Sequence, residues 1–190
     1  MALIRPRLTD YHGIMLGQDE IDFVIPFLDE DIPFCVDPFL LWKSPSQQDN
    51  ALHLALLNSF NYLGFLANIG NLNEAVHRLI LASECNEIGL GFSAKREGAK
   101  IGKELSSKIV SLFTLIPQIK KSGFSHIEEI QLFVDQISRD RISDITCTFL
   151  KSFLIDYTIE QCRKYNIPVS DVQINDVYDQ RANKFVDSLI

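Results

Sequence analysis

Three aspartates and two arginines precede an apolar run between residues 134 and 150. They are Asp135, Asp140 and Asp144, with Arg139 and Arg141 among them. On a helix, Asp140 and Asp144 lie four residues apart and share one face. Carboxylate oxygens are the ligands that Mg²⁺ prefers, and a bound ion of this kind can generate the attacking water of phosphodiester hydrolysis. The alternative is structural, because Asp140 can cap a helix N-terminus and Asp144 can favour its positive end.

A glycine-rich stretch, residues 84–102, leads into the next apolar segment. Backbone N–H groups of such a loop can hold an anion at a helix N-terminus, and nearby basic side chains would add positive charge. The candidate anion contact is Gly89, Gly91, Lys95, Arg96 and Lys100. The stretch lacks the phosphate-loop pattern GxxxxGK[ST], and Ala94 replaces the third glycine of the dinucleotide fingerprint. The alternative is an ordinary connection between two helices.

Two further acids lie near predicted element ends. Asp37 lies at the end of a short apolar stretch that we interpret as a strand, and Glu87 precedes the first glycine of the glycine-rich stretch. Together with the first group they form the candidate metal-ligand set: Asp37, Glu87, Asp135, Asp140 and Asp144. Mg²⁺ is expected only if the protein is a nuclease or phosphodiesterase. The alternative for Asp37 is a turn aspartate whose side chain accepts from the following backbone.

The sequence lacks the motifs of other common metal sites and catalytic sites. The cysteines are Cys35, Cys85, Cys147 and Cys162. They form no CxxC pair and have no zinc spacing with histidine, so reduced, packed thiols in a cytoplasmic protein are expected. The four histidines show no helical ligand spacing, and no GxSxG or HExxH motif occurs.

The charge distribution limits the classes of partner. The net charge of −7 argues against a protein that coats nucleic acid generally. Residues 95–121 nevertheless hold seven bases and two acids, which suits a local nucleic-acid contact or an acidic protein partner. The alternative is a solvated helix face. No membrane partner is expected, because polar residues interrupt every long apolar stretch.

Apolar periodicity and capping residues predict a mainly α (α+β) fold, a compact multi-helix single domain over residues 1–190. Helices are expected over 50–68, 72–84, 99–116, 125–137 and from 140 to about 165. For 125–137 the alternative is a strand over 130–135. Two short strands are expected, at 32–37 and 167–174, and the tail beyond them is ambiguous.

Three stretches together resemble an uncharacterised bacterial family that is loosely associated with antiphage defence loci. They are FLDEDIPFCVDPFLLWKSPSQQD, NEIGLGFS and DRISDITCTFLKSFLIDYTIEQC. The resemblance runs over nearly the whole chain and brings no established activity. It implies that such proteins continue beyond a stretch similar to Val177–Asn183, so a chain truncated at the C-terminus is expected here.

Two functions follow from these observations. The first is a non-catalytic subunit of an antiphage defence complex, which docks on a larger protein effector through exposed phenylalanines and the basic segment 95–121, or forms a homo-oligomer. Thirteen phenylalanines in 190 residues are more than one small core readily buries, and exposed aromatic patches mark interfaces. The second is a metal-dependent nuclease or phosphodiesterase acting in defence.

Overall fold

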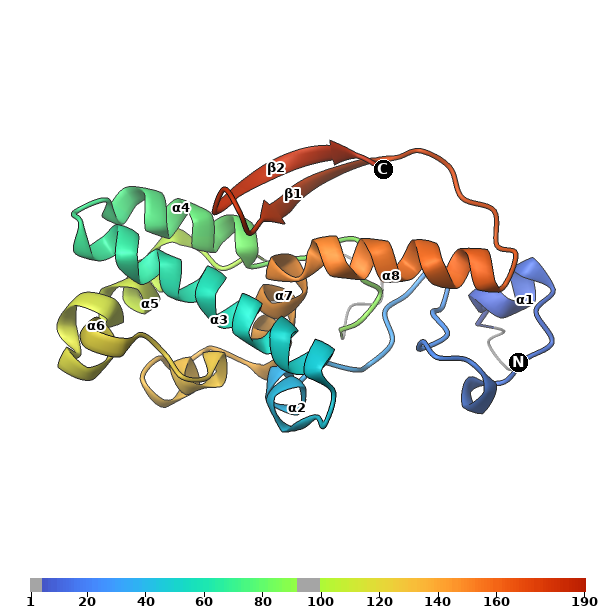
Figure 1. Cartoon of the computed structure of the whole chain (residues 1–190), viewed down its shortest axis with the longest axis horizontal. Coiled ribbons are helices and arrows are strands. Elements are labelled where there is room, and N and C mark those ends of the chain that lie inside the picture. Colours follow the sequence, from blue (N-terminus) through green and yellow to red (C-terminus); the bar gives the residue numbers. More distant parts are fainter. Residues whose placement is uncertain (1–4, 92–99) are drawn as a thin grey trace.

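A computed structural model describes residues 5–91 and 100–190 of the chain. The fold is mainly α, with one small antiparallel sheet, which confirms the predicted class (Figure 1). Among the described residues, no helix is both long enough and apolar enough to cross a bilayer.

The largest part of the core lies among α3 (Gln47–Asn68), α4 (Leu72–Ala82) and α5 (Lys103–Leu115), close to the predicted bounds. Ser46 caps α3 by accepting a hydrogen bond from the backbone N–H of Asp49. The short α6 (Pro117–Ser122) follows α5 directly. These helices gather at one end of the molecule (Figure 1).

Aromatic rings hold this core together. The Phe60 ring on α3 lies 5.7 Å from Phe113 and from Phe124, and 6.5 Å from Phe149. All four side chains are almost fully buried. The pairs of Phe60 with Phe124 and with Phe149 are edge-to-face, a geometry that contributes beyond the area that the rings bury.

The helix predicted from residue 140 to about 165 is wrong in one respect, because the chain forms two helices there. They are α7 (Arg139–Phe149) and α8 (Lys151–Lys164), and they meet at Leu150. Near this junction, the hydroxyls of Thr146 and Thr148 donate to carbonyls four residues earlier, a pattern that bends helices. Ser138, and not Asp140, caps α7 by accepting from the N–H of Arg141.

The predicted helix over 125–137 is also wrong. The segment forms a short 3₁₀ helix, η2 (Ile127–Leu132), and the alternative strand is absent there. His126 is the N-cap residue of η2, and its backbone N–H donates to the Glu129 carboxylate at 3.0 Å. Gln131 then donates to the carbonyl of Ile137, which turns the chain away from a continuing helix.

Of the two predicted strands, the one over 32–37 does not form. Ile32 alone bridges to Leu90, and Val36 donates its N–H to the Ser143 hydroxyl instead of to a neighbouring strand. The second prediction, 167–174, is displaced: the strands are β1 (Gln173–Asp179) and β2 (Lys184–Leu189), which pair as a hairpin. The described chain therefore has two short strands, but both lie near the C-terminal end, mostly in the tail that the sequence left ambiguous.

The hairpin and the N-terminal segment complete the molecule on two sides of α8. The Tyr178 ring of β1 packs 4.9 Å from Phe149, which attaches the hairpin to the core. At the other end, α1 (Leu8–His12) lies beside the end of α8 (Figure 1), and η1 (Gln18–Glu20) follows it along the chain. The Tyr157 hydroxyl donates to the carbonyl of Asp22 at 2.6 Å. The helix α2 (Pro38–Lys43) then leads into α3.

Candidate functional site

The start of α7 brings acids from three parts of the chain together. Asp140 and Asp144 come from α7, Glu84 from the end of the α4 region, and Asp31 from the N-terminal segment. We call Asp31, Glu84, Asp140 and Asp144 the acidic cluster. Carboxylates of Asp31 and Asp140 lie 3.3 and 3.4 Å from the position that a β-carbon on Gly91 would take. Asp31 could not be identified from the sequence, because it lies next to Ile32, whose bridge to Leu90 joins two distant segments.

Like charges and burial act on Asp144 in the same direction. Burial is the largest cause, and the charges of Asp140, Glu84 and Asp31 add to it, so that the pKa of Asp144 is raised to about 7. The Arg141 guanidinium opposes this shift. A carboxyl with such a pKa can hold or release a proton near neutral pH.

The candidate metal ligands divide into separate places. Within residues 5–91 and 100–190, no three His, Cys, Asp or Glu side chains are arranged to hold a metal ion. Only Asp140 and Asp144 of the predicted set lie in the acidic cluster. Asp135 is exposed and lines a different hollow beside Lys108. The five predicted Mg²⁺ ligands therefore do not surround one common position.

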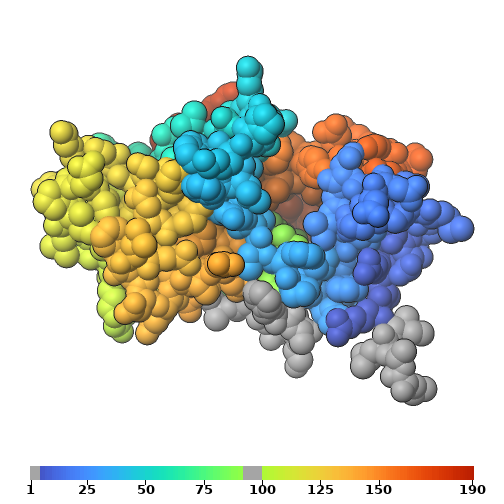
Figure 2. All heavy atoms as spheres, turned by 90° about the horizontal axis from the view of Figure 1, so that it is seen from below, coloured from blue at the N-terminus to red at the C-terminus, as the bar shows by residue number. Residues whose placement is uncertain are grey.

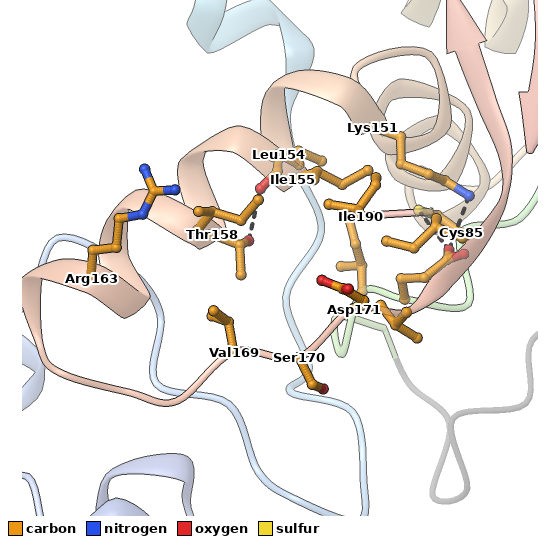
Figure 3. A pocket seen from close by; sticks show the side chains of 15 residues that line it. Cys85, Lys151, Leu154, Ile155, Thr158, Arg163, Val169, Ser170, Asp171 and Ile190 are labelled. Carbon is orange, nitrogen blue, oxygen red and sulfur yellow. Dashed lines mark hydrogen bonds and ion pairs between the residues drawn. The ribbon is translucent and has the colours of Figure 1, made fainter. Parts of the chain in front are cut away.

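Asp37 and Glu87 have structural partners of their own. Asp37 caps α2 by accepting from the N–H of Phe39 at 3.0 Å, which is the turn role left open from the sequence. Glu87 forms an ion pair with Lys151 at 3.0 Å. Figure 3 shows Lys151 and Cys85 together at one end of a pocket of about 480 Å³ that lies between α8 and the chain entering β1.

The candidate anion contact is only partly within the described residues, since Lys95 and Arg96 lie outside them. Gly89 accepts from the N–H of Ile32, and the N–H of Gly91 donates to the carbonyl of Ile32, both at 2.9 Å. The N–H of Gly91 is thus engaged, and carboxylates flank this glycine. Both features disfavour an anion at Gly91. Lys100 is exposed just before α5.

The described bases of the segment 95–121 lie before α5 and on the outer side of α5 and α6. Its described bases are all exposed: Lys100, Lys103, Lys108, Lys120 and Lys121. Lys108 pairs with Glu104 at 2.8 Å along α5. This placement is that of a solvated helix face, and the predicted nucleic-acid contact stays a prediction.

A second feature, on α2, exposes apolar side chains. Phe39, Leu40 and Trp42 are 38%, 65% and 44% exposed, and Phe34, just before the helix, is 59% exposed. We call these four residues the α2 surface. Pro38, which begins the helix, is buried, and Leu41 packs partly buried against the core, so these two residues anchor α2 while Phe39, Leu40 and Trp42 are exposed. The exposure of Phe34 and Phe39 agrees with the expectation that not all phenylalanines enter the core.

Histidines support the α2 surface from behind. The His126 ring lies 4.9 Å from Trp42 and 5.4 Å from Phe39, and His53 of α3 lies 5.4 Å behind it. Burial, and secondly the neighbouring His126, lower the pKa of His53. Sequence spacing could not show this pair, because the two rings come from segments more than seventy residues apart.

A groove of about 860 Å³ runs next to the α2 surface, between residues 33–38 and the segment from η2 to the start of α7. Its charged lining is mostly acidic: Asp37, Glu128 and Asp140, with Arg139 as the base. Burial, followed by smaller effects that include the Asp37 charge, raises the pKa of Glu128. In Figure 2, α2 stands between the gold and orange η2–α7 residues and the blue N-terminal residues.

The comparisons with known proteins establish the family. The model of a domain of unknown function, DUF8370, matches residues 13–190, so the chain belongs to the DUF8370 family. No curated protein and no solved structure matches the chain.

Proposed function

We propose that this member of the DUF8370 family is a non-catalytic subunit that docks on a larger protein through the α2 surface. The observation that carries the proposal is the outward display of Phe39, Leu40 and Trp42 from one short helix. Scattered exposed apolar residues are ordinary, whereas a contiguous aromatic group is typical of an interface.

The composition of the α2 surface supports this choice. Tryptophan is among the residues that contribute most to binding energy at protein interfaces. The Lys43 ammonium lies 4.3 Å from the centre of the Trp42 ring, so one face of this ring already has a cationic neighbour. The His126 ring contacts the Trp42 and Phe39 rings, which limits their rotamers and lowers the entropy lost on binding.

The adjacent groove indicates the chemistry of the partner. Asp37, Glu128 and Asp140 give its lining an acidic excess over Arg139. A partner that places apolar side chains on the α2 surface and a lysine or arginine in the groove would match both features. Such a partner also fits the net charge of −7.

The nuclease alternative receives less support. The predicted ligands do not converge, and no metal-holding group occurs in the described part of the chain. The defence setting rests on the family resemblance of the sequence and is part of the proposal.

Site-specific photocrosslinking in cells that carry the gene tests the docking role. A photoreactive residue replaces Leu40, and the matched control replaces Leu115, which is 73% exposed at the end of α5. We expect one protein to crosslink from position 40 and not from position 115. The purified partner should then bind at least tenfold more weakly to Leu40→Asp and to Trp42→Asp, while Leu115→Asp binds as the wild type does.

Two results would overturn the proposal. One is equal crosslinking from positions 40 and 115. The other is cleavage of DNA or RNA by the purified chain with Mg²⁺ or Mn²⁺ that Asp144→Asn abolishes, which would favour the nuclease. For the defence setting, phage plating on cells with Leu40→Asp should resemble plating on cells without the gene.

A further inference from the structure

The His126 ring lies between α2 and α3 and contacts both helices. Its centre is 4.9 Å from the ring centre of Trp42 and 5.4 Å from that of Phe39 on α2. On the α3 side it is 5.4 Å from the ring centre of His53, which is only 4% exposed. Two rings that can each take a proton therefore lie one behind the other, directly beneath the α2 surface.

The surroundings of His126 fit a neutral ring. Its Nδ1 is buried and has no hydrogen-bond partner among the described residues. A neutral imidazole can keep this nitrogen as an unprotonated acceptor, whereas a protonated imidazole carries an N–H donor on both nitrogens. Because a buried charged donor without an acceptor is costly, a protonated His126 requires the ring or its neighbours to move.

A proton on His53 meets a similar obstacle. Burial, and secondly the neighbouring His126, lower the pKa of His53. Below the ordinary histidine pKa of 6.5 the native state therefore binds fewer protons than the unfolded chain, so native stability from this group falls as the pH drops through that value. A charge on one ring opposes a charge on the other, and His126 is the less buried of the two. The first proton therefore goes to His126.

Neighbouring charges do not favour a cation at His126. The charged groups of the surrounding elements are Asp37 and Lys43 at the two ends of α2, Asp49 of α3, and Glu128 and Glu129 of η2. The Lys43 ammonium already lies 4.3 Å from the centre of the Trp42 ring. Asp49 accepts from the Ser44 hydroxyl, and Glu129 accepts from the backbone N–H of His126. Burial raises the pKa of Glu128, which reduces the negative charge that it can offer in acid.

We propose that proton uptake by the His53–His126 pair separates the α2 surface from its histidine support, so that docking is lost in mildly acidic solution. This inference rests on the proposed docking role and adds its regulation. At neutral pH the uncharged His126 ring holds Phe39 and Trp42 in place for binding. In acid this support is withdrawn, and protonation of Glu128 lowers the negative charge of the adjacent groove, so a basic partner is released for both reasons.

Trp42 is the single tryptophan of the chain, so its fluorescence tests the switch without any partner. Acrylamide, a neutral quencher, measures the accessibility of the Trp42 ring, and lifetimes convert the quenching into a bimolecular constant. Between pH 7.5 and pH 5.5, which spans the titration of an ordinary histidine, we expect this constant to rise about twofold and to return on neutralisation. Far-UV circular dichroism should stay constant, because the core helices remain folded.

Ring-preserving substitutions identify the group that takes the proton. His126→Phe keeps an aromatic ring beside Trp42 and cannot be protonated, so its quenching constant should be equal at the two pH values. The smaller substitution His126→Gln makes the same prediction if His126→Phe does not fold. His77→Phe is the matched control, because His77 is exposed on α4, and it should respond as the wild type does.

Two results of this experiment would overturn the inference. One is a wild-type quenching constant that does not change between pH 7.5 and pH 5.5. The other is a pH response that persists in the His126 variants, which would place the proton on another group such as Glu128.

The partner captured by crosslinking from position 40 tests the link to docking. The wild-type chain should bind it about tenfold more weakly at pH 5.5 than at pH 7.5, and His126→Phe should lose less than about threefold. Both chains share any titration of the partner itself, so the difference between them isolates His126. Unchanged binding in spite of an accessible Trp42 would overturn the regulation and leave the docking role intact. Absence of a captured partner would overturn the docking role itself, and the fluorescence experiment, which needs no partner, distinguishes the two failures.

Discussion

Lys151 at the start of α8 lies 3.0 Å from the carboxylate of Glu87, and its side chain is only 5% exposed. The same ammonium donates to the carbonyl of Asn175 at 3.0 Å. One buried cation therefore joins α8, the chain after α4 and β1. Because an ammonium without partners in a buried position is costly, this contact fixes the relative positions of three segments.

Breaking that ion pair should destabilise the fold. We expect Glu87→Gln to lower the free energy of unfolding by about 2 kcal/mol, less than for a fully buried pair because Glu87 is 39% exposed. Urea unfolding of Glu87→Gln, Lys151→Met and the double variant measures the coupling. If the two single effects add without coupling, the pair contributes no interaction energy.

The pKa of Asp144 predicts how stability depends on pH. Its folded pKa, about 7, lies above the ordinary aspartate pKa of 3.8, so between about pH 4 and pH 7 the native state binds more protons than the unfolded chain. Stability from this group is therefore fully present below pH 4 and is lost as the pH rises through 7.

Replacing the Asp144 carboxyl should remove this loss of stability at higher pH. At pH 4 the free energy of unfolding of Asp144→Asn should be close to that of the wild type. At pH 8 it should exceed that of the wild type by on the order of 3 kcal/mol. Urea unfolding at both pH values checks this. The matched control is Asp135→Asn, since Asp135 is exposed. Equal differences from the wild type at both pH values would contradict the proposed effect of the acidic cluster.

Gly64 allows α3 and α5 to approach closely. A β-carbon at this position would overlap the Phe113 ring. Gly64→Ala should therefore destabilise the protein by about 2 kcal/mol, although alanine favours a helix over glycine by about 1 kcal/mol. Chemical unfolding measures this difference.

Two companion variants test the packing explanation. At Gly102, before α5, a β-carbon would meet nothing within 4 Å, so Gly102→Ala is the control and should stay within about 1 kcal/mol of the wild type. Adding Phe113→Leu to Gly64→Ala should relieve the overlap. A stabilised Gly64→Ala protein would show that helix propensity outweighs packing.

Asn61 on α3 holds the chain after α6 by two hydrogen bonds. Its amide donates to the carbonyl of Phe124 and accepts from the N–H of Phe124, both at 2.9 Å. Asn61→Ala leaves both backbone groups of a buried residue without this partner, so a loss of about 2–3 kcal/mol is expected from unfolding curves. Asn58→Ala, at an exposed position of the same helix, should have little effect.

The helices α3, α4 and α5 were predictable because their signals are local. Apolar residues recur at helical spacing, Gly70 and Asn71 separate the first two, and Pro117 limits the third. The helix ending at Phe149 was not predictable in the same way. Apolar periodicity continues through Leu150, so the periodicity does not mark the end of α7 there. That end depends on side-chain hydrogen bonds and tertiary contacts, which periodicity does not report.

At the candidate sites, the sequence identified one neighbouring pair of acids, but it did not identify the residues that distant segments bring beside that pair. The spacing of Asp140 and Asp144 was sufficient to place them on one helix face. Asp31 joins them through an isolated bridge at Ile32, more than one hundred residues away in the chain. The His53–His126 pair depends on a similar long-range contact.

The sequence by itself determined the helical class, the principal core helices and the outward display of some phenylalanines, because periodicity, caps and composition act within a few turns of the chain. Tertiary structure alone decided which apolar stretch became a strand. A strand requires a hydrogen-bonding neighbour. Among the described residues, 32–37 have a bridging partner only at Ile32, whereas the hairpin strands β1 and β2 pair with each other. It also decided which acids share a neighbourhood, because charges from distant segments interact only after packing has brought them together.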